Sequence, residues 1–539
     1  MAAFANKCAQ YWPSGDGETE EYGDIVVKIT GHKYFPDYIT RKLHVSHKRE
    51  KTERDITHIQ FTVWPDHGVP DDPNLLLKLR RRVNALSNFF SGPIIVHCSA
   101  GVGRTGTYIS IDAMLEGLEA EGRVDVYGYV VQLRRQRCLM VQVESQYMFI
   151  HKSLVEYNQF GETEVSMTEL PLILNNLKMK DPTSEPSQLM CEFQRLPSYR
   201  NWRPQTTGTH QDNKDKNRSS IVPYEFNRVQ IKIDEEPEQE VTEDSEMSSD
   251  DDSDSEESIY INASYIIGYW GTREIIAAQG PLKNTLSEFW QMIFQKKVKA
   301  VVMLSAPNQE NNEKNCAPYW KEKSKTYDDL QVELTSENSC GSYTERCFEI
   351  RHAKRKEVRK VSQFSYDQWE EALPVKINEL MDMITKIKKD IPTKRMEEQT
   401  KHDKTVPLVV HCSDGSQLTG TFSALWYLLE SANVEGVIDV FQIVKNLRRQ
   451  RSGIVSSFEQ YQFLYDALAS TVPAQNGQIK SSPKQEDKLE IQNELETKVA
   501  PSSKTVPGEE TSSKPTDDDT TANGPSPAAF TDVTLRIDE

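Results

Sequence analysis

A cysteine and an arginine six positions apart, Cys98 and Arg104, are the pair in this 539-residue chain whose types and spacing point most directly to chemistry. Small residues between them would let backbone N–H groups turn inward around an anion, as in a phosphate-binding loop. The N-terminus of a helix beneath the cysteine and the cation at position 104 would both favour its thiolate form. We therefore predict a nucleophilic cysteine in an anion-binding loop. The residues lining that loop would be Ser99, Ala100, Gly101, Val102 and Gly103.

The segments on either side of the loop fit this interpretation. The apolar run 93–96 and the amphipathic stretch from Thr105 predict a strand, a tight loop and a helix. A cysteine after a buried strand is often an inert core residue, and glycine-rich loops after strands are common. Because small residues fill the whole loop, and because Arg-Thr-Gly ends it, we favour the catalytic interpretation.

A second stretch offers the proton donor that cleavage of a phosphate ester requires. Residues 64–70 read Trp-Pro-Asp-His-Gly-Val-Pro, which places Asp66 in a turn-forming sequence. Turn chemistry alone would explain these residues. A carboxylic acid on a mobile loop that closes over the cysteine would also protonate the leaving oxygen and exclude water. We predict that Asp66 is the general acid and that Trp64 is a hinge or packing anchor.

The elements that must position these loops follow from periodicity. Residues 21–63 alternate as short strands broken by glycine and proline. Helical patterns cover residues 73–90, 105–118 and 130–137, and a further helix begins near residue 142. Arg134, Arg135 and Arg137 are expected as surface or loop-anchoring charges.

Taken together, HCSAGVGRTG at 97–106 and WPDHGVP at 64–70 resemble the signature loops of the classical protein tyrosine phosphatases. The resemblance implies attack by the Cys98 thiolate on phosphotyrosine, with Arg104 and the backbone of 99–104 holding the phosphoryl oxygens. Asp66 would then act first as acid and later as base. The resemblance implies no metal and no organic cofactor, and its substrates would be phosphotyrosine-containing proteins.

Four further residues gain supporting roles from the same resemblance. Thr105 would hydrogen-bond the Cys98 sulfur, and His97 would tune the thiolate through the loop backbone. Gln142 would bind substrate and orient the hydrolytic water, with Gln146 as the secondary contributor.

The chain carries the pattern twice. KCAQYW at 7–12 recurs as NCAPYW at 315–320. HCS at 97–99 recurs at 411–413, and LRRQR at 133–137 recurs at 447–451. The second copy also has front motifs that resemble the family and that the first lacks, at 216–218, 260–264 and 279–281. We expect an α/β (α+β) fold of two tandem tyrosine-phosphatase domains, each a twisted mixed sheet flanked by helices, with the first truncated at its N-terminus.

Domain boundaries follow from the repeat and from composition. The expected parts are a first domain at 1–160, a linker at 161–190, a second domain at 191–470 with an acidic disordered insert at 234–257, and a disordered tail at 471–539.

The second copy has lost the residues that the chemistry needs. Leu418 stands where Arg104 stands, which removes the bidentate phosphate clamp. Asp414 replaces Ala100 and places a carboxylate where an anion should bind. The acid loop has become YDQWEEALP at 366–374, with Glu371 near the acid position. We expect Cys412 to be buried and non-catalytic, and the second domain to be a pseudophosphatase in a regulatory or docking role.

Composition narrows the functional class. A net charge of −18 argues against nucleic acid as a partner. Eight cysteines without a Cys-x-x-Cys pair argue against a zinc site or a disulfide framework, and they fit a reducing compartment. No apolar run is long enough to span a membrane. We expect a cytoplasmic chain, and the tandem arrangement resembles the cytoplasmic portion of single-pass, receptor-type tyrosine phosphatases of the plasma membrane.

Two alternatives remain open. Ser248, Ser249 and Ser253 each precede an acidic residue three positions on, which is typical of acceptors for an acidophilic kinase. A merely solubilising insert explains them equally well. If the truncated first domain does not fold, the chain is a catalytically inactive fragment that acts as a binding or regulatory module through its second domain.

Overall fold

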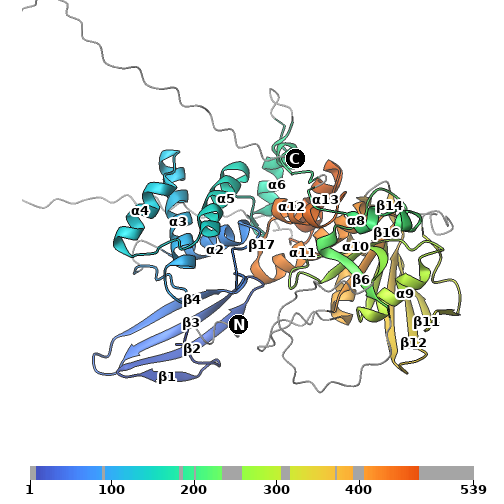
Figure 1. Ribbon diagram of the computed structural model, residues 1–539, viewed down its shortest axis with the longest axis horizontal. Helices are drawn as coiled ribbons and strands as arrows, with labels where there is room; N and C mark the ends of the chain where they lie inside the picture. Colours follow the sequence, from blue (N-terminus) through green and yellow to red (C-terminus); the bar gives the residue numbers. More distant parts are fainter. Residues whose placement is uncertain are drawn as a thin grey trace, which may run out of the picture. The chain divides into compact units, whose positions relative to one another are not determined.

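The computed structural model describes residues 8–87, 92–180, 186–199, 202–233, 258–304, 316–370, 373–391 and 406–472, which fall within one compact unit, Met1–Val472. Two copies of one arrangement of sheet and helices follow each other along these residues, the first in blue to cyan and the second in green to orange (Figure 1).

The first copy begins with an antiparallel four-stranded sheet. Its strands run in the order of the chain, and their alternating side chains place Val27, Ile29 and Leu43 in a small apolar cluster. The expected strands in the region 21–63 are therefore confirmed. They are β1 (Thr19–Tyr22), β2 (Ile25–Tyr34), β3 (Tyr38–His47) and β4 (Glu53–Phe61).

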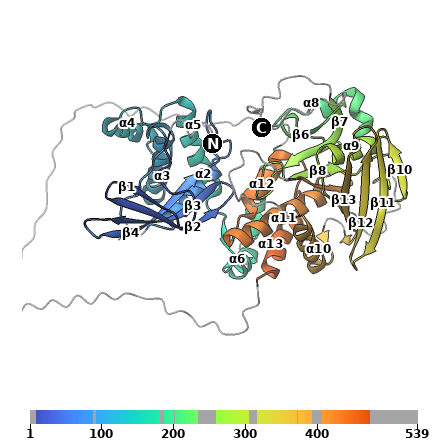
Figure 2. The same cartoon turned by 90° about the horizontal axis from the view of Figure 1, so that it is seen from below.

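Helices of the first copy pack over one end of this sheet (Figure 2). Their shared core contains Leu77, Ile111, Leu115 and Phe149, which come from three different helices. Ile111 and Leu115 are four residues apart and so lie on the same face of one helix. The expected helices are confirmed with slightly shifted ends. They are α2 (Asn74–Asn84), α3 (Gly103–Glu121), α4 (Val126–Gln136) and α5 (Glu144–Phe160).

The strand predicted at residues 93–96 is not formed. The segment has no regular secondary structure and makes no ladder with any strand among the described residues. As a result Ile94 is 50% exposed and Ile95 is 86% exposed. A strand needs a hydrogen-bonding neighbour as well as an apolar sequence, and in the second copy the corresponding strand lies between two others.

The second copy contains a nine-stranded mixed sheet, in the order β10-β11-β12-β13-β9-β16-β8-β7-β6. Its strand β16 pairs in parallel with both β8 and β9 and is buried along its whole length, including His411. The strands are β6 (Arg228–Lys232), β7 (Ser258–Ile266), β8 (Ile275–Gln279), β9 (Ala300–Leu304), β10 (Ser324–Tyr327), β11 (Leu330–Ser339), β12 (Tyr343–His352), β13 (Val358–Tyr366) and β16 (Leu408–Cys412).

Helices and short elements complete the second copy. The meander β10–β13 and the helices α10 to α13 repeat β1–β4 and α2 to α5, so the tandem α/β architecture is confirmed. These elements are α8 (Thr206–Thr209), the 3-10 helices η1 (Gln211–Lys216) and η2 (Glu225–Asn227), α9 (Leu286–Gln295), the hairpin β14 (Trp369–Glu370) and β15 (Leu373–Pro374), α10 (Ile377–Asp390), α11 (Gln417–Glu435), α12 (Val440–Gln450) and α13 (Phe458–Ser470).

Residues 161–190, which the sequence suggests as a linker, contain regular elements within their described part. Strand β5 (Val165–Ser166) pairs with β17 (Val437–Ile438), and helix α6 (Leu170–Lys178) buries Leu170 and Leu174 in the core of the second copy. Helix α7 (Gln188–Gln194) follows.

Several sequence-based expectations fall on residues outside the description. These are the acidic insert 234–257 with Ser248, Ser249 and Ser253, residue Glu371, and the tail from residue 473. Within the described residues, no helix is long and apolar enough to cross a membrane.

Candidate active site

The loop after residue 96 presents Cys98 to the N-terminus of α3. Gly101 adopts a left-handed φ of 69°, which turns the chain so that the backbone N–H groups of the loop face the sulfur. The Thr105 hydroxyl donates to the Cys98 sulfur at 3.2 Å. The carbonyl of Val102 accepts from the N–H groups of Gly106 and Val141, at 3.0 and 3.1 Å, and so ties the loop to the start of α3 and to the segment before α5.

These donors favour an ionised cysteine. Burial alone would raise the pKa of the Cys98 thiol, but the hydroxyl and N–H of Thr105 and the N–H groups of Gly101 and Val102 outweigh it. They hold the pKa below its ordinary value. A half-buried cysteine surrounded by these donors fits the predicted nucleophile, a role that stays a prediction.

Arg137 braces this loop from α4's C-terminal end. Its Nε donates to the carbonyl of Gly101 at 2.9 Å, and its Nη2 donates to that of Ala100 at 3.0 Å. With the carbonyls held outward, the N–H groups are left to face the sulfur. The sequence left two roles open for this arginine, a surface charge or a loop-anchoring charge, and the structure shows that Arg137 anchors the loop.

Arg104 connects residues 64–70, which carry Asp66 and are called the acid loop, to residues 97–106, called the signature loop. The Arg104 Nη2 donates to the carbonyl of Pro65 at 2.9 Å, and the guanidinium lies 5.7 Å from the centre of the Trp64 ring. The indole of Trp64 donates to the carbonyl of Gly68 at 3.2 Å, which closes the loop on itself. Asp66 lies exposed at the tip of this loop, between Pro65 and Gly68.

Both predicted glutamines lie against the loop. The side chain of Gln146 is buried, and its Oε1 accepts from the N–H of Gln142 at 2.9 Å. A Cβ at Gly103 would lie 2.9 Å from Gln146 Nε2 and 3.3 Å from Gln142 Oε1. The glycine at 103 therefore leaves the space that the two side chains occupy beside the start of α3.

His97 connects the loop to the segment 8–12. Its Nδ1 lies 3.2 Å from the carbonyl oxygen of Cys98, and its Nε2 lies 2.6 Å from the hydroxyl of Tyr11. Because a carbonyl only accepts, Nδ1 donates and Nε2 accepts from Tyr11. Tyr319 and His411 repeat this contact at 2.8 Å in the second copy, so sequence reasoning missed a partner that the repeated Tyr-Trp pair could have indicated.

The corresponding loop of the second copy is filled by its own carboxylate. Asp414 Oδ1 accepts from the N–H and the hydroxyl of Ser416, at 3.0 and 2.7 Å. Burial, and secondly the charge of Asp414, raise the pKa of the Cys412 thiol, which is 3% exposed. Leu418 packs against the apolar core where the first copy has its arginine.

Arg451 is the counterpart of Arg137 and has more partners. It donates to the carbonyls of Gly415 and Asp414, at 2.7 and 2.9 Å, and to the side chains of Ser264 and Asn262, at 3.0 and 2.8 Å. The latter two lie on β7, in a part of the sheet that the first copy lacks among the described residues. The arginine that holds the loop is therefore fully buried in the second copy, as Arg451, and exposed in the first, as Arg137.

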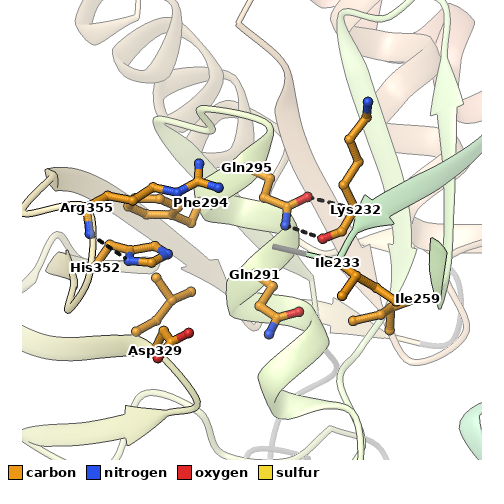
Figure 3. A pocket seen from close by; sticks show the side chains of 10 residues that line it. Lys232, Ile233, Ile259, Gln291, Phe294, Gln295, Asp329, His352 and Arg355 are labelled. Atoms are coloured by element: carbon orange, nitrogen blue, oxygen red, sulfur yellow. Dashed lines mark hydrogen bonds between the residues drawn. The ribbon is translucent and has the colours of Figure 1, made fainter. Parts of the chain in front are cut away.

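A separate pocket of about 200 Å³ lies in the second copy, between β6, α9 and the end of β12 (Figure 3). It is lined by Lys232, Ile233, Ile259, Gln291, Phe294, Gln295, Asp329, Leu330, His352 and Arg355. None of these residues belongs to the loop that carries Cys412, so the pocket plays no part in the candidate site.

The family model described as protein-tyrosine phosphatase matches residues 2–156 and 213–470, which covers both copies. The chain belongs to the protein-tyrosine phosphatase family. Its two segments of match coincide with the two copies described above, and the fold predicted from the motifs is the fold of this family.

Curated relatives of this family are similar over most of the chain. Receptor-type tyrosine-protein phosphatase C of Homo sapiens is 59% identical over 91% of the chain and 38% of its own length. The Rattus norvegicus protein of the same name is 56% identical over 98% and 43%. Receptor-type tyrosine-protein phosphatase alpha of Homo sapiens is 38% identical over 87% and 56%. The chain therefore spans about two fifths to just over half of the length of these relatives.

Proposed function

We propose that this chain hydrolyses phosphotyrosine in proteins and that its first copy, within residues 1–160, carries the catalytic site. The observation that carries the proposal is the set of donors around Cys98, which depresses the pKa of its thiol while its counterpart Cys412 has a raised pKa. The family membership and the names of the relatives support the reaction class.

The reaction proceeds in two displacements. The Cys98 thiolate attacks phosphorus, the bond to the tyrosine oxygen breaks, and Asp66 gives its proton to that oxygen. The resulting cysteinyl-phosphate is attacked by water, whose proton returns to the Asp66 carboxylate as the phosphorus–sulfur bond breaks. Inorganic phosphate leaves, and the thiolate is regenerated.

Charge on the transferring group is balanced by the loop. Arg104 and the inward N–H groups of residues 99–104 bind the equatorial oxygens, which carry more negative charge in the transition state. Gln142, with Gln146 behind it, orients the attacking water. In the structure Arg104 donates to Pro65, so one side chain connects the phosphate clamp to the acid loop.

We propose that the second copy, within residues 191–470, is inactive and serves in regulation or docking. The support is chemical: Asp414 occupies the donors that a phosphate would need, and Leu418 cannot clamp an oxyanion. The serines at 248, 249 and 253 remain proposed acceptors for an acidophilic kinase, on their sequence pattern. The receptor-type names of the relatives support a cytoplasmic location as part of a membrane receptor.

A second candidate function rests on the exposed segment 93–96. Ile94 and Ile95 are exposed, and no described strand pairs with them. If this edge leaves the first copy unable to hold its loop, the chain acts as a binding or regulatory module through the second copy.

Hydrolysis of a phosphotyrosine peptide separates the two candidates. The wild-type chain is expected to release phosphate, and Asp66→Asn is expected to slow it by roughly 10²–10⁴ at pH 7, as loss of a general acid does. Retained folding of the first copy, followed by hydrogen exchange in α2 to α5, is the control. A folded wild-type chain without turnover would contradict the enzyme assignment and favour the binding module.

A further inference from the structure

The C-terminal end of the acid loop is attached to the second copy of the chain. Asp72, two residues after Pro70, is 9% exposed. Its Oδ1 accepts from the N–H of Asn74 at 3.0 Å, at the start of α2, and its Oδ2 accepts from the side-chain amide of Asn446 on α12, also at 3.0 Å. One carboxylate therefore joins the root of the acid loop to a helix of the second copy.

Helix α2 has a second attachment to the same copy. Lys78 and Arg82 are four residues apart and thus share a face of the helix. Their nitrogens lie 2.8 and 3.2 Å from the carboxylate of Glu435, whose side chain is 2% exposed at the end of α11. Glu435 also accepts from the hydroxyl of Tyr269 at 2.9 Å. The hydroxyl of Tyr38 is a fourth donor, at 3.4 Å. A buried carboxylate with four donors is costly to disrupt, so α2 has a fixed position on the second copy.

The other end of the acid loop is held from within the first copy. Trp64 packs edge-on against Phe149 of α5, with ring centres 6.1 Å apart, and Arg104 holds the carbonyl of Pro65. The exposed tip with Asp66 thus lies between an anchor in the first copy and an anchor in the second. The range of positions open to Asp66 depends on both anchors.

We infer that Asn446 and Glu435 of the second copy are positioning residues for the proposed general acid of the first. The inference rests on the proposed function, because it assigns Asp66 as the acid. Asn446 fixes the carboxylate that accepts from the N–H of Asn74 at the start of α2, and Glu435 fixes the face of α2 that carries Lys78 and Arg82. Without these contacts the loop samples more positions, and the leaving oxygen is protonated less often. Attack by Cys98 itself does not depend on them.

The dependence of rate on the leaving group tests this assignment. A phenol with a high pKa needs a proton as it leaves, whereas a nitrophenol with a low pKa does not. We expect Asn446→Ala to lower kcat for phenyl phosphate roughly tenfold, the effect of one hydrogen bond to a charged group, with less than about a twofold loss for dinitrophenyl phosphate. Inhibition by inorganic phosphate is expected to stay unchanged.

Gln442→Ala is the matched control. Gln442 lies on the same helix and also donates a side-chain amide to a carboxylate of the first copy, Glu156 of α5, at 3.1 Å. Among the described residues, its side chain makes no hydrogen bond to residues 64–84, which hold the acid loop and α2. The control is expected to keep the wild-type ratio of the two rates. An unchanged ratio in Asn446→Ala, or an equal change in Gln442→Ala, would overturn the inference.

Hydrogen exchange tests the positioning role without a measurement of turnover. Amides of residues 62–76 are expected to exchange faster in Asn446→Ala and in Glu435→Gln than in wild type, but not in Gln442→Ala. A wild-type chain that hydrolyses neither aryl phosphate would contradict the proposed function. Exchange in residues 62–76 that the Asn446 substitution leaves unaltered would contradict the positioning role, whatever the turnover.

Discussion

Replacement of Thr105 by valine tests the electrostatics of the signature loop. Valine keeps the shape of threonine but removes the hydroxyl that donates to the Cys98 sulfur at 3.2 Å. Thr105 is 6% exposed, so water has little room to replace that donor. The N–H groups of Gly101, Val102 and Thr105 remain, so the loop keeps its form while the thiolate loses one of its donors.

The size of the effect follows from the kind of bond. A hydrogen bond to a charged group contributes about 1.5–3 kcal/mol, and one pKa unit corresponds to about 1.4 kcal/mol. Loss of the hydroxyl is therefore expected to raise the pKa of Cys98 by roughly 1–2 units. Below the wild-type pKa the thiolate population falls by roughly 10- to 100-fold, and at high pH the two proteins converge.

The rate of alkylation of Cys98 by iodoacetamide, followed as a function of pH on the peptide that contains this cysteine, measures its pKa and separates it from the exposed Cys138, Cys191 and Cys340. Thr107→Val is the control, because the Thr107 hydroxyl is equally buried but donates to the carbonyl of Gly103 at 3.0 Å and not to the sulfur. The more basic thiolate of the Thr105 variant is also slightly more nucleophilic, which partly offsets its smaller population. A pKa that stays at the wild-type value, or that rises equally in the Thr107 variant, would refute the reasoning.

Cys98→Ser is expected to abolish phosphotyrosine hydrolysis and Cys412→Ser to leave it unchanged; comparable losses would contradict the inactive assignment of the second copy. Arg137→Ala should lower kcat with little change in the urea midpoint. Arg451→Ala should destabilise by about 3 kcal/mol, since it removes the donor of four acceptors, three of them in buried hydrogen bonds; equal effects on the urea midpoint would be inconsistent with the different burial of the two arginines. Burial raises the pKa of Asp439 to about 6, above its value in the unfolded chain. Between about pH 4 and 6 the folded chain therefore binds more protons than the unfolded chain, and its stability falls as the pH rises through this range. Asp439→Asn should remove this contribution, and urea midpoints at pH 4.5 and 7.5 that keep the wild-type difference would rule it out.

Local sequence predicted the parts of the site that local structure determines. Cys98, the small residues after it and Arg104 all lie in one loop at the start of one helix, so their types and spacing suffice to place them. The substitutions from which we predict an inactive second copy are equally local, because Leu418 and Asp414 stand at fixed offsets from Cys412. The roles of these residues stay predictions until they are tested.

Contacts between residues that lie far apart along the chain could not be predicted from the sequence. Arg137 lies 36 residues from the carbonyl that it holds, and Asp72 lies 374 residues from Asn446. The strand expected at 93–96 failed for a related reason, since an apolar sequence specifies which residues suit a strand but not whether a neighbouring strand is present. Helix α6 was read as linker because its apolar face matters only once the second copy covers it.

The carboxylate of Asp414 also gives the two copies different thermodynamic responses to their surroundings. A phosphate or vanadate ion that binds the first loop stabilises that copy by about 2.7 kcal/mol at one hundred times its dissociation constant. The second loop already holds its own carboxylate at the N–H of Ser416, so we expect the same ion to add little stability there. Melting curves in phosphate and in a non-binding buffer are therefore expected to differ in the transition of the first copy and to agree in that of the second.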